Sequence, residues 1–163
     1  MAAGRLLIAG IGYTNLRDVS VGPVLSARLL ERRWPAWVDI DDFSFGAIDA
    51  VHRLRDAGYD RALFFGAMDR GDAPGTIRDY LWDQPGKPDL IAVQERVAEA
   101  AQAVISLETT LVVAGYFNAL PQYTRVIEIE PLDMEYGEGF SAPVLAAIER
   151  LDLLLEEEVA AVA

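Results

Sequence analysis

The sequence predicts an α/β fold: a three-layer sandwich in which helices flank a mostly parallel, twisted sheet. Short apolar runs alternate along the chain with stretches whose apolar residues recur every three or four positions. The first pattern is typical of buried strands and the second of amphipathic helices. Because regular alternation of strands and helices builds parallel sheets covered on both faces, the order of these segments predicts the fold class.

The first half of the chain contains three expected strands and two expected helices. The strands are predicted at 5–11, 37–40 and 61–65. Apolar residues at helical spacing mark the helices, at Val21, Val24, Leu25 and Leu29 and again at Ile48, Val51 and Leu54. Gly58 is expected to end the second helix, because glycine adopts the left-handed conformation that often terminates helices.

The second half is expected to begin with a turn at 73–76, an edge strand at 77–81 and a loop at 84–88. Val93, Val97, Ala101 and Val104 form the apolar stripe of a third helix. Two further strands are predicted at 111–114 and 125–129, with additional strand material expected up to Tyr123.

The C-terminal segment is expected to be one helix followed by a loose end. Ser141 is predicted to cap this helix, whose apolar stripe is Val144, Ile148, Leu151 and Leu155. The acidic run at 156–158 and the alanines after it are expected to fray.

Composition narrows the classes of function. With 163 residues and 52% hydrophobic content, residues 1–163 are expected to form one domain. A formal net charge of -12 disfavours nucleic acid and anionic membranes as partners. The absence of cysteine excludes thiolate metal sites and a cysteine nucleophile, and no long apolar run or signal peptide is evident. A cytoplasmic location is therefore expected.

Acidic residues follow three of the predicted strands. In parallel sheets, ligands bind beyond the carboxyl ends of strands. The acids expected at this edge are Asp18, Asp41, Asp42, Asp69 and Asp72. Together they could bind a hard cation or perform acid-base chemistry, but aspartate is also common in turns because of its local hydrogen bonds. Each acid taken alone is better explained as a turn or surface residue.

Other candidate positions are less specific. Gly10-x-Gly12 lacks the third glycine of a dinucleotide-binding loop, since Asn15 stands there. His52 is expected on a helix surface. Tyr13, Phe43 and Phe45 would bring apolar side chains to the mouth of the cleft, either as loop packing or as a surface for a peptide.

Four motifs in the same order resemble those of the hydrogenase maturation endopeptidase family, whose members trim the C-terminal tail of nickel-iron hydrogenase large subunits. The resemblance spans nearly the whole chain. Its motifs are Gly10-x-Gly12, Asp18, Gly22 and Pro23; Trp37-Val38-x-Ile40-Asp41 with Ser44; Ala67-x-Asp69-x-Gly71 with Pro74-Gly75; and Ile129-x-Pro131 with Phe140-Ser141-x-x-Val144.

The chain departs from this family where nickel is recognised. The resemblance implies an acid in the first loop, an aspartate ending the third strand and a histidine beginning a later helix. The corresponding positions here are Val19, Gly66 and the segment 90–94, which has no histidine. Asp42 and Phe43 also replace a glycine pair. Neither valine nor glycine has a side chain that can bind a metal, so we expect no nickel site and no cofactor.

The leading interpretation is a non-catalytic member of this family that binds a protein partner as an assembly or accessory subunit. The resemblance implies a hydrogenase-like large subunit, or a larger complex, as that partner. One alternative is an active endopeptidase or other hydrolase that uses Asp18, Asp41 and Asp69; another is a small-molecule or sensory domain. We also expect Val19 and Gly66 to face one crevice. The substitutions Val19→Glu and Gly66→Asp, combined with a histidine placed within 90–94, are expected to restore nickel binding.

Overall fold

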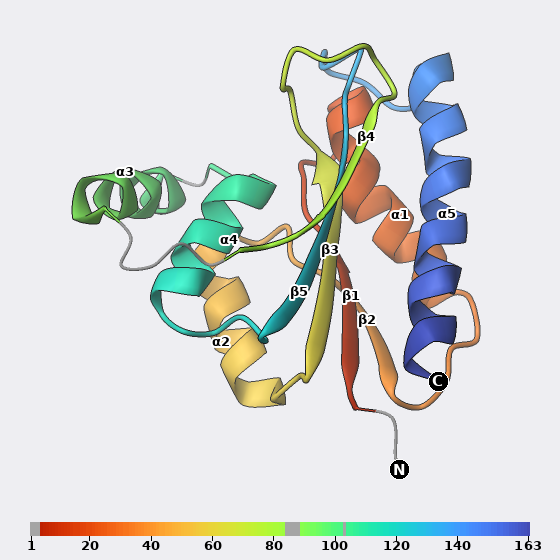
Figure 1. The fold of residues 1–163 in the computed structure, drawn as a ribbon. Helices are drawn as coiled ribbons and strands as arrows, with labels where there is room; N and C mark the ends of the chain where they lie inside the picture. Colours follow the sequence, from red (N-terminus) through yellow and green to blue (C-terminus); the bar gives the residue numbers. More distant parts are fainter. Residues whose placement is uncertain (1–3, 84–88, 103) are drawn as a thin grey trace.

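A computed structural model describes residues 4–83, 89–102 and 104–163, and it has the predicted α/β architecture (Figure 1). Five strands form one sheet in the order β2-β1-β3-β5-β4. Their bounds are β1 (Leu6–Gly10), β2 (Val38–Asp42), β3 (Arg61–Ala67), β4 (Ile77–Leu81) and β5 (Tyr123–Ile129). Strands β2, β1, β3 and β5 are parallel, and β4 pairs antiparallel with β5 at the edge. The predicted strands at 61–65, 77–81 and 125–129 are thereby confirmed.

Two layers of helices cover the sheet (Figure 1). A short 3-10 helix, η1 (Arg17–Ser20), leads into α1 (Val21–Leu30), which lies with α5 (Ala142–Val162) on one face. On the other face lie α2 (Ala47–Ala57) and α4 (Leu107–Tyr116), and α3 (Leu90–Ala101) packs on α4 farther from the sheet. Gly58 ends α2 in the left-handed conformation, with φ 64°, as expected.

The strand predicted at 111–114 is wrong, because these residues belong to α4. Ser106 begins this helix, and its side chain accepts a hydrogen bond from the Thr109 N–H at 3.1 Å. Helix α4 is enclosed between the sheet, α2 and α3, so most of its surface is apolar. A helix buried on several sides has no apolar stripe, and its short apolar run therefore resembles a strand. The additional strand material expected up to Tyr123 is also absent, because α4 ends at Tyr116 and residues 117–122 form no strand before β5 begins at Tyr123.

The loose C-terminal end predicted at 156–163 is also wrong, because α5 continues to Val162. Glu158 holds this end on the sheet: its side chain is only 3% exposed and pairs with Arg61 at 3.0 Å and Arg125 at 2.8 Å. Both arginines come from strands, at the end of the sheet opposite the candidate site. A buried carboxylate with two guanidinium partners resists fraying.

Three smaller findings complete the fold. Helix α3 ends at Ala101, before Val104, and of its predicted stripe only Val93 is buried. The loop predicted at 84–88 lies outside the described residues. Within the described ranges, no helix combines the length and apolar character needed to cross a membrane.

Candidate functional site

The carboxyl ends of β1 and β3 are packed too closely for larger residues. A Cβ atom on Gly10 would lie 2.2 Å from the Gly22 carbonyl oxygen, and one on Gly12 would lie 2.4 Å from the Val19 carbonyl oxygen. These glycines let α1 and its preceding loop approach the strand directly. The Gly10-x-Gly12 motif is therefore explained by backbone packing.

Asp18 is the most constrained acid at this edge. Its side chain is fully buried, and its carboxylate accepts hydrogen bonds from the Leu132 N–H at 2.9 Å and the Asp133 N–H at 2.8 Å. It also accepts from the N–H and the hydroxyl of Ser141, at 2.8 and 2.7 Å. Four donors from residues more than a hundred positions away thus converge on one carboxylate. Asp18 joins the loop after β1 to the loop after β5.

Burial raises the pKa of Asp18, but the hydrogen bonds from Asp133, Ser141 and Leu132 outweigh burial and hold the pKa below its ordinary value. Asp18 is thus kept as a carboxylate whose lone pairs are occupied by neutral donors. The hydroxyl of Ser141 donates to Asp18 and makes no capping bond to α5, so Ser141 occupies the predicted N-cap position without the predicted side-chain role.

Backbone contacts join the same two loops along their length. The Arg17 N–H donates to the Gly137 carbonyl at 3.1 Å, and the Gly137 N–H donates to the Asn15 carbonyl at 2.8 Å. The Arg17 guanidinium lies 3.4 Å from the Asp133 carboxylate. Asn15 and Arg17 both have positive φ, at 58° and 43°. The first loop is held in a strained conformation by its partner loop.

Gly66 cannot carry a side chain without a shift of the backbone. A Cβ atom there would lie 2.4 Å from the Ile11 carbonyl oxygen and 3.2 Å from a methyl carbon of Leu107 in α4. This contact opposes the expected graft of an aspartate at this position. That Val19 and Gly66 face one crevice stays a prediction. Gly66 is not at a positive φ, so the obstacle is steric and does not come from left-handed backbone strain. Val19 is half-buried in η1.

The other predicted acids do not gather with Asp18. Asp41 pairs with Arg53 at 2.9 Å, Asp42 accepts from the Ser44 N–H at 2.9 Å, and Asp69 accepts from the Gly71 N–H at 3.3 Å. Asp72 pairs with Arg78 at 2.7 Å, and this hydrogen bond lowers the pKa of Asp72. Across the described ranges, no three His, Asp or Glu side chains are placed to hold a metal ion.

The aromatic candidates separate into core and surface residues. Phe43 is 1% exposed and packs against Phe64 with ring centroids 5.8 Å apart, so this predicted cleft residue belongs to the core. Phe45 is exposed beside Arg53. The Tyr13 hydroxyl accepts a hydrogen bond from the Ile105 N–H at 2.7 Å and so joins the first loop to the start of α4. His52 is exposed on α2, as predicted.

Sequence reasoning missed a second buried acidic group beside the site. Glu128 is 3% exposed and accepts hydrogen bonds from the Arg70 guanidinium and the Tyr80 hydroxyl. Glu130 is 5% exposed and accepts from the backbone N–H groups of Arg70 and Gly71. These contacts fix the loop after β3. The sequence feature that could have revealed them is the alternation of glutamates with isoleucines at 127–130, since an acid inside a buried strand requires a partner.

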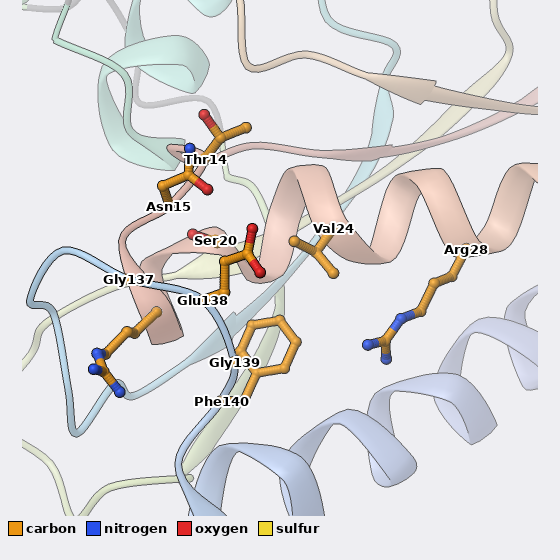
Figure 2. A pocket seen from close by; sticks show the side chains of 10 residues that line it. Thr14, Asn15, Ser20, Val24, Arg28, Gly137, Glu138, Gly139 and Phe140 are labelled. Atoms are coloured by element: carbon orange, nitrogen blue, oxygen red, sulfur yellow. The ribbon is translucent and has the colours of Figure 1, made fainter.

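A cavity of about 340 Å³ opens between the first loop, α1 and the loop after β5 (Figure 2). The Phe140 ring forms one wall, with Val24 nearby and the Arg28 guanidinium 5.9 Å from the ring centroid. Arg28 extends from α1 on one side of the Phe140 ring, and Glu138 belongs to the loop that leads to Phe140 (Figure 2). None of the residues predicted for the site lines this cavity.

Comparison with known structures identifies the fold. A hydrogenase 2 maturation peptidase from a Thaumarchaeota archaeon is 24% identical, with 94% of this chain and 97% of that chain covered and a TM-score of 0.65. The hydrogenase maturating endopeptidase HybD of E. coli is 20% identical, with 94% and 93% covered and a TM-score of 0.67. The maturation protease HycI of Thermococcus kodakarensis is 18% identical, with 96% and 93% covered and a TM-score of 0.63.

Comparison of the sequence with protein families and with curated proteins gives no match. The structural likeness extends over nearly the whole chain, and the chain has the hydrogenase maturation protease fold that its motifs predicted.

Proposed function

We propose that this chain is a non-catalytic relative of the hydrogenase maturation endopeptidases that binds a protein partner as an assembly or accessory subunit. The observation that carries the proposal is that two positions which the resemblance assigns to nickel recognition offer no ligand: Val19 has no ligand atom, and a Cβ atom on Gly66 would lie 2.4 Å from the Ile11 carbonyl oxygen. Asp18 does not replace them, because its carboxylate is fully buried and accepts four hydrogen bonds from neutral donors that link two loops. Losing any of these bonds would leave a buried donor unsatisfied.

The neighbouring position supports the same proposal. A peptidase of this fold that recognises nickel in its substrate needs further ligands beside the first loop. Here Val19 has no ligand atom, and any side chain at Gly66 would collide with the Ile11 carbonyl. Because the nickel is held by the substrate, a peptidase of this fold would have to recognise it through side chains at these positions.

The alternative of an active hydrolase that uses Asp18, Asp41 and Asp69 is less well supported. Each of these acids has its own partners, and the three do not converge on one point. A general acid or base must reach the reacting group, and a fully buried Asp18 does not.

The partner that we propose is a hydrogenase-like large subunit or a complex containing one. This rests on the shared fold and on the names of the structural neighbours, which are maturation proteases of hydrogenases. Binding without cleavage would keep the docking function of the fold while its chemistry is lost.

A tail-cleavage assay tests the proposal. A nickel-loaded large-subunit precursor is incubated with this chain, and HybD with its own precursor serves as the positive control. We expect the precursor to keep its tail after prolonged incubation with this chain. Nickel-dependent shortening of the precursor that Asp69→Asn or Asp41→Asn abolishes would show that the site is an active peptidase.

A further inference from the structure

Three large apolar side chains are exposed in the loop between β5 and α5, residues 130–141, which we call the β5–α5 loop. Leu132 is 57% exposed, Met134 is 48% exposed and Tyr136 is 81% exposed. All three lie within five consecutive residues. A concentration of exposed apolar side chains in one loop is typical of an interaction site, whereas isolated ones are ordinary.

The backbone of this loop is held in place at several points. Asp18 accepts hydrogen bonds near its start, from Leu132 and Asp133, and at its end, from Ser141. Gly137 pairs with the first loop near the middle. The apolar side chains are therefore presented on a fixed backbone, and fixing a surface before binding reduces the entropy lost on association.

The charge of the loop selects the chemistry of its partner. Residues 130–141 contain four acids and no lysine or arginine. Glu130 is buried in hydrogen bonds and Asp133 pairs with Arg17, whereas Glu135 and Glu138 are exposed and form no ion pair within the described part of the chain. The whole chain carries a formal charge of -12, which attracts cationic partners over distance.

We propose that the β5–α5 loop is the docking surface for a protein segment in which lysine or arginine residues lie between apolar residues. The apolar residues of that segment would cover Leu132, Met134 and Tyr136, and its cations would pair with Glu135 and Glu138. This inference rests on the proposed protein-binding function and names the surface and the chemistry of the partner. Tyrosine and methionine are enriched in such interfaces.

The test uses a fluorescein-labelled peptide of about twelve residues with interspersed leucines and lysines, and a comparator with glutamate in place of lysine. Anisotropy measures affinity, and NMR of the Leu132 and Met134 methyl groups locates the contact. The variants are Leu132→Ser with Tyr136→Ser, and Glu135→Gln with Glu138→Gln. The matched control is Leu153→Ser with Glu157→Gln on the exposed side of α5.

We expect the lysine peptide to shift the methyl signals and the glutamate peptide to leave them unchanged. The apolar double variant should bind the lysine peptide at least about tenfold more weakly. The glutamine double variant should lose most of the salt dependence of binding, and the α5 control should bind as the unaltered chain does.

Equal affinity of the loop variants and the α5 control, or unshifted methyl signals, would overturn the inference. That outcome is separate from failure of the proposed function, which would appear as cleavage of the hydrogenase precursor.

Discussion

Asp18 and Asp69 are the same residue type at the same edge of one sheet, in the loops after the adjacent strands β1 and β3, yet their surroundings differ. Asp18 is fully buried and accepts four hydrogen bonds from distant residues. Asp69 is exposed and accepts one local bond, from the Gly71 N–H. The difference shows that position at the edge of a sheet does not make an acid a catalytic group: Asp18 holds loops together, and Asp69 shapes a turn.

Replacing Asp18 should have the largest effect. Asp18→Ala leaves three backbone N–H groups and the Ser141 hydroxyl without their acceptor, and we expect it to lower the free energy of unfolding by about 3 kcal/mol or more. Asp69→Ala should change it by less than about 0.5 kcal/mol. Urea denaturation of both variants measures the contrast, and equal effects would contradict it.

Two glycines provide a second contrast. Gly66→Ala places a Cβ atom 2.4 Å from the Ile11 carbonyl oxygen, and we expect a loss of roughly 1–3 kcal/mol. Gly115→Ala in α4 meets its nearest neighbours at 3.7 and 3.8 Å and should stabilise the protein by roughly 0.5–1 kcal/mol through helix propensity. Thermal unfolding distinguishes them. If Gly66→Ala left the free energy of unfolding unchanged, the end of β3 would be able to shift and accept the added Cβ atom.

The same steric obstacle decides the nickel graft. A variant combining Val19→Glu, Gly66→Asp and Gln94→His should not bind nickel, because the Gly66→Asp side chain must displace Ile11 or Leu107. Circular dichroism would establish that the variant is folded before nickel titration. Micromolar nickel binding by the folded variant would show that the end of β3 can shift to accept a side chain at this position.

The pH dependence of stability should reflect the lowered pKa of Asp18. Since its pKa is lower in the folded state than in the unfolded state, the stabilisation is complete above the unfolded value near 3.8 and is lost as the pH falls through the folded value. We expect the free energy of unfolding to fall more steeply below pH 4 in the unaltered chain than in Asp18→Asn. Parallel curves in denaturant titrations would mean that Asp18 contributes no such linkage.

The surface pair of Asp41 and Arg53 should matter least. Both side chains are more than a third exposed, and such pairs contribute roughly 0.5 kcal/mol or less. Asp41→Asn should therefore have a small effect on the free energy of unfolding, which disappears at high salt. A loss as large as that of Asp18→Ala would give Asp41 a structural role that its exposure does not suggest.

Periodicity was sufficient to predict helices α1 and α5 and their buried stripes, because each of these helices buries one stripe and exposes the other side. It failed for α4, which is enclosed on several sides and has no stripe. The C-terminal end of α5 was missed because Glu158 is stabilised by arginines that are distant in the sequence. One of them, Arg61, lies nearly a hundred positions away.

The same contrast between local patterns and distant contacts applies to the candidate site. The Gly10-x-Gly12 motif is visible in the sequence, but the close approach of α1 and the first loop, which requires these glycines, is visible only in the fold. The partners of Asp18 lie more than a hundred residues away, so no local pattern separates it from Asp69. Residues whose role comes from distant contacts require the structure.

Calorimetric titration of the unaltered chain with nickel at neutral pH tests most directly whether the fold is kept and metal recognition is lost. We expect no saturable binding near 1 μM, which would correspond to about -8 kcal/mol. Zinc and manganese should behave in the same way. A micromolar nickel site that disappears in Asp69→Asn while the protein remains folded would contradict the account.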